Sequence, residues 1–233
     1  METQHIIVVG GGLAGIVCSL ELLDAGCYVT LLDRDTPDNL GGLAKESFGG
    51  ILLVDTPEQR RQKVQDSVDL ALQDWLAFGE IDANAHLDPQ HPQHWPRRWA
   101  EHYLQDSGQY VYQWLKQRGI GFLPMPLWVE RGMGTGSNGA LRGNSVPRWH
   151  VVWGTGHELA SQLAKRLLAH PQRKRLTLKF GHKVSDLIIS NGHAQGCHGI
   201  VESTQAAFEV MGDCVVIAAG GINGGNLEQV RQH

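Results

Sequence analysis

The stretch IIVVGGGLAG, residues 6–15, decides the expected fold of this chain. Its first four residues are all apolar, which is typical of a strand buried on both faces of a parallel sheet. The strand runs directly into Gly10, Gly12 and Gly15, which have the spacing of the dinucleotide-binding motif G-x-G-x-x-G. In this motif the first glycine permits a tight turn, the second lets the backbone approach a pyrophosphate, and the third lets a helix pack close to the sheet.

The residues that follow complete a βαβ unit. Residues 13–25 have the apolar periodicity of a helix, and residues 28–32 form a second apolar strand that ends at Asp33. The amides and the dipole at the N-terminus of such a helix favour a bound phosphate group. Asp33 lies eighteen residues after Gly15, close to the spacing of a carboxylate that binds a ribose hydroxyl. Because these parts occur together and in order, the sequence predicts a dinucleotide-binding unit rather than an incidental glycine turn.

Length and composition restrict the class of protein. The chain has 233 residues, enough for one or two domains, and its net charge of −4 provides no basic surface for nucleic acid or an anionic membrane. The four cysteines include no C-x-x-C pair, so we expect a reducing compartment and packing roles, with Cys18 and Cys214 buried. The first strand begins almost at the N-terminus, and no apolar run has the length of a membrane span. We therefore expect a cytoplasmic protein with a small-molecule substrate.

A second glycine-rich stretch, GGLAKESFGG at residues 41–50, lies where a simple nicotinamide-binding fold would continue into another helix. Glycines have no side chain, so a flat or bulky ligand can lie directly on the backbone there. Two ordinary surface turns are the alternative interpretation of this stretch taken alone.

Together, the VVGGGLAG motif, the acidic end of the second strand and the pattern G-G-x-A-x-x-S-x-G-G resemble the flavoproteins grouped with fumarate reductase and 3-ketosteroid dehydrogenases. Within that group the chain is most similar to the predicted FAD-binding dehydrogenases close to the ketosteroid branch. The resemblance implies that residues 42–50 surround the FAD pyrophosphate and approach the isoalloxazine ring, while Asp33 holds the adenosine ribose. The full set of cofactor contacts implied in this way is Gly10, Gly12, Leu13, Ala14, Gly15, Asp33, Arg34, Gly42, Leu43, Ala44, Ser47, Gly49, Gly50, Val184, Ala218 and Gly220.

Two long helices are predicted after the second glycine-rich stretch. The sequence TPEQ at residues 56–59 predicts a helix start with a capping box, and the apolar positions continue to Phe78. Residues 95–118 form the second helix, whose aromatic residues we interpret as packing residues because they recur at helical spacing. Between the two, His91 and His94 have a spacing found in metal sites, but no cysteine or helix fixes their geometry, so we predict no metal.

A long glycine-rich stretch follows at residues 124–149, and structureless loops of this length are usually functional lids or disordered. In the resembled family the chain leaves the cap domain here, with polar residues near the substrate. Arg148 and His150 are therefore the substrate-side candidates. The alternative for these two residues is a surface salt bridge and a satisfied histidine. The sequence identifies no proton-transfer residue.

The last part of the chain returns to strands. The Asn-Gly pair at residues 191–192 lies between two strand-like runs and predicts a hairpin, and residues 206–211 extend it to a three-stranded meander. Such a meander is a feature of the family's FAD domain, in which Val184 matches the backbone position that contacts adenine. Residues 214–221 form a further buried strand that ends in glycines, and residues 226–232 begin a helix.

These interpretations predict an α/β fold with a Rossmann-like FAD-binding domain, a parallel sheet with a β-meander formed by residues 1–80 and 151–233. Residues 81–150 are expected to form part of an inserted α-rich cap domain. The resemblance implies an FAD-dependent oxidoreductase that transfers hydride between flavin and a carbonyl-activated carbon of a steroid-like or enoate-like substrate. A non-catalytic dinucleotide-binding fragment and an NAD(P)-dependent dehydrogenase are the alternatives.

The family's proteins continue well beyond the length of this chain. By resemblance, the chain is therefore expected to be an N-terminal portion that holds the adenosine diphosphate end of the site and lacks groups around the flavin ring. Such a portion can be inactive alone. It is also expected to expose apolar surface, which self-association would cover.

Overall fold

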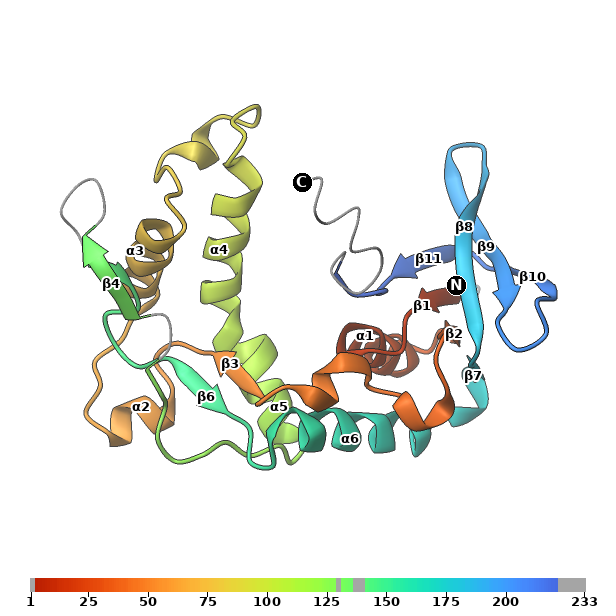
Figure 1. Ribbon diagram of the computed structural model, residues 1–233, viewed down its shortest axis with the longest axis horizontal. Coiled ribbons are helices and arrows are strands. Elements are labelled where there is room, and N and C mark those ends of the chain that lie inside the picture. The colour runs from red at the N-terminus through yellow and green to blue at the C-terminus, as the bar shows by residue number, and fades with distance from the viewer. Residues whose placement is uncertain (1–2, 129–130, 136–140, 222–233) are drawn as a thin grey trace. The chain divides into compact units, whose positions relative to one another are not determined.

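The computed structural model divides into two compact units, each described here by itself (Figure 1). The residues that it describes are 3–128, 131–135 and 141–221. Unit 1 comprises Met1–Ser47 and Gly156–His233, and unit 2 comprises Phe48–Thr155. The strand that begins at Gly50 pairs within unit 2. The expected division into an FAD-binding domain at residues 1–80 and 151–233 and a cap region at residues 81–150 stays a prediction. The helix predicted over residues 226–232 lies outside the described residues.

Unit 1 is built on a four-stranded parallel sheet with the strand order β11-β1-β2-β7. The strands are β1 (His5–Val9), β2 (Tyr28–Leu32), β7 (Leu176–Lys179) and β11 (Cys214–Ile217). Val8 of β1 pairs with Leu31 on one side and with Val216 on the other, so β1 is a central strand. Its apolar run is buried as predicted. The prediction for Cys214 was wrong, because β11 is the edge strand of the described sheet and Cys214 is exposed there.

The central strands carry a different layer on each face. On one face lies α1 (Leu13–Asp24), which buries Ile16, Leu20 and Leu23. On the other face Ile7 and Leu32 pack against Cys197 of a separate antiparallel sheet with the order β10-β9-β8. This sheet is the predicted meander, formed by β8 (His182–Ser190), β9 (His193–Val201) and β10 (Ala207–Met211).

The meander and the helix α6 follow local sequence signals. Asn191 and Gly192 have φ values of 50° and 77°, as the type I′ turn of a two-residue hairpin requires. The helix α6 (Thr155–Leu168) buries Leu159, Leu163 and Leu167, which repeat every four residues. Short 3₁₀ turns of the chain span Pro37–Asn39, Gly42–Glu46, Ala85–Leu87 and Arg173–Arg175.

Unit 2 contains two short antiparallel strand pairs. β3 (Gly50–Leu52) pairs with β6 (Trp149–Val151), and β4 (Arg131–Thr135) pairs with β5 (Leu141–Gly143). The glycine-rich stretch at residues 124–149 was expected to be a structureless loop. That expectation was wrong, because the stretch contains the β4–β5 pair.

The helix predicted from residue 56 to Phe78 is in fact two helices, α2 (Pro57–Arg61) and α3 (Val68–Phe78). The predicted capping box of α2 is present. The Thr56 hydroxyl oxygen accepts a hydrogen bond from the Gln59 amide at 3.2 Å, and Oε1 of Gln59 accepts one from the Thr56 amide at 2.9 Å.

The interruption between α2 and α3 has two visible causes. Lys63 has a φ of 57°, which no α-helix accommodates, and the Ser67 hydroxyl then caps α3 by accepting a hydrogen bond from the Leu70 amide at 3.1 Å. The interruption leaves Asp66 outside either helix, where its carboxylate contacts Arg148.

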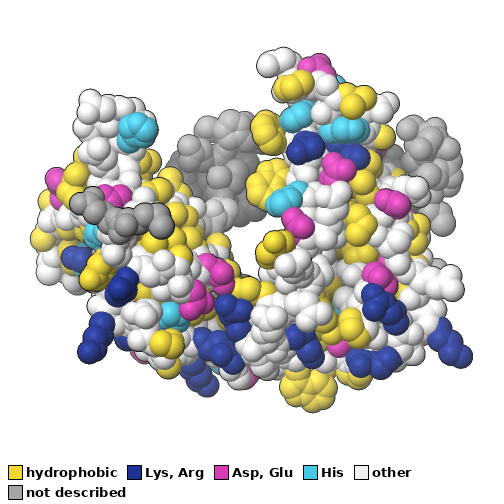
Figure 2. Space-filling view, turned by 180° about the vertical axis from the view of Figure 1, so that it is seen from behind, with side chains coloured by type: hydrophobic (Ala, Val, Ile, Leu, Met, Phe, Trp, Pro, Cys, Tyr) yellow, Lys and Arg dark blue, Asp and Glu magenta, His cyan; other side chains and the backbone are white. Residues whose placement is uncertain are grey.

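The second predicted helix of unit 2 is helical throughout but changes type. It consists of α4 (His94–Asp106), a π-helix (Ser107–Gln113) and α5 (Trp114–Gln117). Trp99 and Tyr110 are 67% and 64% exposed, so the prediction that they serve as packing residues was wrong. Trp99 is not among the residues that α4 buries, which are Arg97, Ala100 and Leu104. Tyr110 lies in the π-helix, where i→i+5 hydrogen bonding shifts the angular positions of side chains away from the α-helical stripe. Figure 2 shows hydrophobic side chains at the surface among polar ones.

Among the residues that the structure describes, none of the helices has the length and hydrophobicity of a membrane span. In the same described part of the chain, no group of three His, Cys, Asp or Glu side chains is arranged to hold a metal ion. His91 lies 3.8 Å from a carboxylate oxygen of Asp82, and Nδ1 of His94 lies 3.2 Å from the carbonyl oxygen of Ala85.

Candidate functional site

Two glycines of the G-x-G-x-x-G motif are required by the packing of unit 1. Gly10 has a φ of 110°, and a Cβ there would overlap the carbonyl oxygen of Ala218 at the end of β11. A Cβ at Gly15 would overlap the carbonyl oxygen of Gly10 itself, so α1 approaches the end of β1 as closely as a backbone allows. The roles predicted for these two glycines, a tight turn and close helix packing, match this geometry.

Gly12 differs from both, because a Cβ there would meet no atom within 4 Å. Its backbone therefore borders open space at the N-terminus of α1. That helix has no capping side chain and no acidic residue in its first turn. Its first amides and the positive end of its dipole can thus bind an anion. A diphosphate fits this position by charge and by space.

The second glycine-rich stretch lies against the first. Gly12 and Gly41 form a parallel bridge, and the Gly41 amide donates a hydrogen bond to the Gly11 carbonyl at 2.8 Å. Gly42 has a φ of 57°, and a Cβ there would lie 3.3 Å from Cα of Gly12. Leu43 and Ala44 follow in the same short turn. Two stretches that lie apart in the sequence thus meet at the backbone of Gly12.

Two small residues of α6, Gly156 and Ala160, pack against the second glycine-rich stretch. The sequence analysis did not identify either of them. A Cβ at Gly41 would lie 2.9 Å from Cβ of Ala160. A Cβ at Gly156 would overlap the Ala44 carbonyl oxygen and the Ser47 hydroxyl, and the Gly156 amide donates to the Ser47 carbonyl at 3.0 Å. The available signal was the four-residue spacing of Gly156 and Ala160, which puts two small residues on one helix face.

Asp33 shapes the first glycine turn from the end of β2. Its Oδ2 accepts a hydrogen bond from the Gly11 amide at 2.5 Å, and its Oδ1 accepts one from the Asp35 amide at 2.7 Å. Each carboxylate oxygen keeps a second lone pair, so the same side chain has capacity for a ribose hydroxyl. The neighbouring Arg34 forms an exposed ion pair with Glu202 at 2.7 Å.

The remaining predicted cofactor contacts are spread over both units. Ala218 donates its amide proton to the last carbonyl of β1 at 2.8 Å, which places it beside the first glycine. Gly220 borders open space, and Val184 is half-buried in the apolar layer between the meander and the sheet. Gly49 and Gly50 belong to unit 2, where Gly50 begins β3.

Comparison with known proteins identifies the family. Residues 5–233 match the family model described as FAD binding domain. The chain belongs to this family. FAD as the predicted cofactor and the predicted α/β fold with a parallel sheet are thereby confirmed.

The curated relatives include a steroid dehydrogenase and a fumarate reductase. A KsdD-like steroid dehydrogenase of Mycolicibacterium smegmatis is 39% identical over all of this chain and 42% of its own length. A fumarate reductase of Schizosaccharomyces pombe is 28% identical over 94% of this chain and 39% of its own length. The chain thus spans about two fifths of the length of these curated relatives.

Solved structures resemble the chain in fold. Sdh1 of Mycobacterium smegmatis superimposes with a TM-score of 0.69 at 21% identity, over 95% of this chain and 34% of that one. Quinol fumarate reductase FrdA of E. coli gives a TM-score of 0.64 at 17% identity, over 95% of this chain and 33% of that one. At these identities the likeness concerns the fold.

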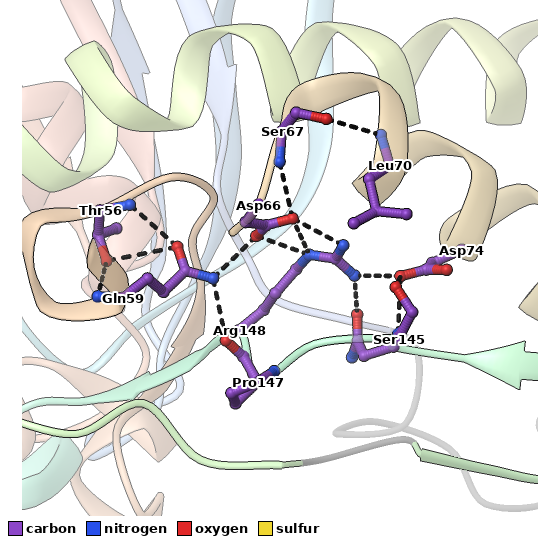
Figure 3. Close-up of polar contacts among 10 residues, drawn as sticks. Thr56, Gln59, Asp66, Ser67, Leu70, Asp74, Ser145, Pro147 and Arg148 are labelled. Atoms are coloured by element: carbon purple, nitrogen blue, oxygen red, sulfur yellow. Dashed lines mark hydrogen bonds and ion pairs between the residues drawn. The ribbon is translucent and has the colours of Figure 1, made fainter. Parts of the chain in front are cut away.

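Arg148, a predicted substrate-side residue, is fully buried in unit 2 (Figure 3). Its Nε and Nη2 donate to the carboxylate of Asp66, with the shortest distances at 2.9 and 2.8 Å. Its Nη1 donates to Asp74 at 2.5 Å and to the side-chain oxygen of Asn144 at 2.9 Å. Burial lowers the pKa of Arg148, but the hydrogen bonds and charges of the two carboxylates outweigh it and raise that pKa. The guanidinium thus holds residues 144–148 against α3. This arrangement favours the alternative that Arg148 forms a salt bridge, although the salt bridge is buried and not on the surface.

His150, the second substrate-side candidate, is also fully buried in unit 2. Its Nδ1 lies 2.8 Å from the carbonyl oxygen of Arg148, and its Nε2 lies 2.7 Å from the hydroxyl of Thr56. Because a carbonyl only accepts hydrogen bonds, Nδ1 carries the proton and the Thr56 hydroxyl donates to Nε2. Both ring nitrogens are satisfied in the neutral form. A substrate-side role for Arg148 and His150 stays a prediction.

The stability of unit 2 is expected to decrease in mild acid because of His150. Burial lowers the pKa of this histidine from its ordinary value of 6.5. Below pH 6.5 the unfolded chain therefore binds a proton that the folded chain does not, so the free energy of unfolding falls as the pH falls. Urea unfolding of the wild type and of His150→Asn between about pH 7.5 and 5.5 measures the effect. The variant should show a flatter pH dependence of the free energy of unfolding than the wild type. Equal slopes for wild type and His150→Asn would contradict the assignment.

Proposed function

We propose that this chain forms the adenosine diphosphate part of the FAD site in a flavin-dependent oxidoreductase. The observation that carries the proposal is the contact between the two glycine-rich stretches at the open N-terminus of α1. A nicotinamide-binding unit needs only the first stretch, whereas a second backbone segment against Gly12 suits the larger FAD molecule.

Individual roles are proposed from the positions of the residues, most of which belong to unit 1. The diphosphate is assigned to the open side of Gly12, where Leu13, Ala14 and Gly42 present backbone. Asp33 is assigned to the ribose hydroxyls, with its hydrogen bond to Gly11 as the second function of the same carboxylate. The other proposed contacts are Gly10, Gly15, Arg34, Leu43, Ala44, Ser47, Gly49, Gly50, Val184, Ala218 and Gly220.

Most of the proposed FAD contacts belong to unit 1, with Gly49 and Gly50 in unit 2, and the substrate-side candidates Arg148 and His150 belong to unit 2. Bound FAD supplies hydride transfer to or from a carbon next to a carbonyl group. The positive end of α1 compensates the negative charge of the diphosphate, and Asp33 and the glycine backbones orient the cofactor. A steroid-like substrate is supported by the relative that is 39% identical and is named a steroid dehydrogenase.

A visible absorption spectrum of the purified protein tests the cofactor assignment. We expect flavin bands, and release of FAD on denaturation, either as purified or after incubation with FAD. The FAD-loaded protein is then assayed with a 3-keto-steroid and an artificial electron acceptor, and separately with fumarate and a reduced dye. Steroid-dependent dye reduction supports the proposed substrate class. Turnover of fumarate and not of the steroid would contradict a steroid-like substrate and indicate a fumarate-like one. Binding of NAD(P) in place of FAD would contradict the proposal as a whole.

A further inference from the structure

Unit 2 contains a cavity of about 220 Å³ that shares no residue with the proposed FAD contacts. Its lining residues are Leu52, Ala71, Asp74, Trp75, Phe78, Gly143, Asn144 and Arg148. At about 30 Å³ of liquid volume per water molecule, the cavity has room for a single ring that carries a short side chain. The lining divides into an apolar wall and a polar end.

The apolar wall is formed mainly by α3 and β3. Trp75 and Phe78 lie three residues apart on α3 and therefore on neighbouring positions of one helix face. The ring of Trp75 packs against Tyr103 with 5.9 Å between the ring centroids, which fixes its orientation. Phe78 is 49% exposed, and Leu52 of β3 adds an aliphatic surface. Two aromatic side chains thus border a space of ring size.

The polar end is formed by Asp74, whose two carboxylate oxygens have different surroundings. Oδ2 accepts three hydrogen bonds, from Nη1 of Arg148 at 2.5 Å and from the amide and hydroxyl of Ser145 at 2.8 and 2.7 Å. Oδ1 accepts none from the described part of the chain, although the side chain is only 12% exposed. Figure 3 shows this second oxygen directed away from the guanidinium.

The charges at this end are unequal. Among the side chains that the structure describes here, Asp66 and Asp74 contribute two negative charges and Arg148 contributes one positive charge. Asp66 binds the guanidinium through both of its oxygens, so Asp74 carries the excess. Four of the five guanidinium N–H groups of Arg148 donate to Asp66, Asp74 and Asn144, so its charge is already shared between these partners. A buried excess of negative charge is stabilised by a cation that donates a hydrogen bond to it.

We propose that this cavity binds a small organic cation, namely a protonated amine on a short chain attached to an aromatic or alicyclic ring. The ammonium group donates a hydrogen bond to Oδ1 of Asp74 and neutralises the excess charge. The ring fills the apolar part beside Trp75 and Phe78, whose π faces also attract the cation. This site is independent of the FAD proposal, since its residues and its ligand are different.

Three probes of one shape and different charge test the proposal by isothermal titration calorimetry on the whole chain. They are 2-phenylethylamine, which is cationic at neutral pH, the neutral 2-phenylethanol and the anionic phenylacetate. We expect the amine to bind at least tenfold more tightly than the alcohol, about 1.4 kcal/mol, and the carboxylate not to bind. Equal affinity for amine and alcohol, tighter binding of the carboxylate, or no binding of any probe would overturn the proposal.

Two variants then locate the binding site, with circular dichroism as the check on folding. Asp74→Asn removes the excess charge and should reduce the preference for amine over alcohol at least fivefold. Phe78→Ala leaves the Arg148 contacts intact and should weaken the amine and the alcohol by similar factors. Trp99→Ala removes an exposed aromatic side chain that does not line the cavity, and should change neither affinity. Unchanged affinities in folded Phe78→Ala would place the ligand elsewhere and refute the site.

Discussion

Replacing Gly12 with valine is expected to weaken FAD binding roughly 10- to 100-fold, equivalent to about 1–3 kcal/mol of steric cost, while the protein stays folded. Gly12 has a φ of −73°, which any residue can adopt, and a Cβ there meets no protein atom within 4 Å. The new side chain would instead occupy the space proposed for the diphosphate. Flavin fluorescence titration measures the affinity, and thermal unfolding without FAD measures the fold.

For Gly15→Ala, only three residues away, we expect a loss of stability instead. Its Cβ would overlap the Gly10 carbonyl oxygen, so α1 must move off the sheet. Overpacking of this kind costs about 3 kcal/mol, which lowers the melting temperature of a chain of this size by about 6–12 °C. Gly108→Ala serves as the matched control, because a Cβ at Gly108 meets no atom within 4 Å. FAD affinity unchanged in Gly12→Val, or unchanged stability in Gly15→Ala, would contradict the site geometry.

The contrast between these two glycines explains why the cofactor end of the fold could be predicted from the sequence. The close packing of α1 on the first glycine turn is set within a βαβ unit, by Gly10 and Gly15, so their spacing carries that information, whereas the contact of Gly10 with Ala218 of the β11 end is long-range. The meander was predictable for the same reason, because Asn191 and Gly192 fix a hairpin locally. The contact of Gly41 with Ala160 of α6 was not predictable in this way, since it depends on a helix far along the chain.

Unit 2 shows where local patterns give the wrong answer. The apolar spacing from residue 64 to Phe78 is that of one helix, yet the chain breaks at Lys63 and begins α3 only after Ser67. The break is compatible with a contact between residues far apart in the sequence, because it places the Asp66 carboxylate against Arg148. Neither aspartate was identified as a partner of Arg148, because more than seventy residues separate them in the sequence. The acidic Asp74 within the apolar face of α3 was the one local signal.

Replacing Arg148 with methionine is expected to destabilise unit 2 by about 3–5 kcal/mol. The variant removes the partner of a fully buried Asp66 and of a largely buried Asp74, so two carboxylates remain in a poorly solvated place. Arg148→Lys should lose a substantial part of the same stability, because an ammonium group cannot reproduce the planar set of bonds to Asp66, Asp74 and Asn144. Urea unfolding, followed by tryptophan fluorescence, measures both changes.

A double-mutant cycle separates the ion pair from a general packing effect. If the unpaired Asp66 carries most of the cost, Asp66→Asn combined with Arg148→Met should be clearly more stable than the sum of the single losses predicts. The exposed pair of Arg60 and Asp55, at 2.7 Å, is the control, and Arg60→Met should leave stability unchanged because water solvates both charges. Additive losses in the cycle would mean that the pair of Arg148 and Asp66 does not carry the cost, which would then lie with the contacts of Arg148 to Asp74 and Asn144. A coupled result would instead show that the position of residues 144–148 on α3, and with it the polar end of the cavity, depends on this buried charge pair.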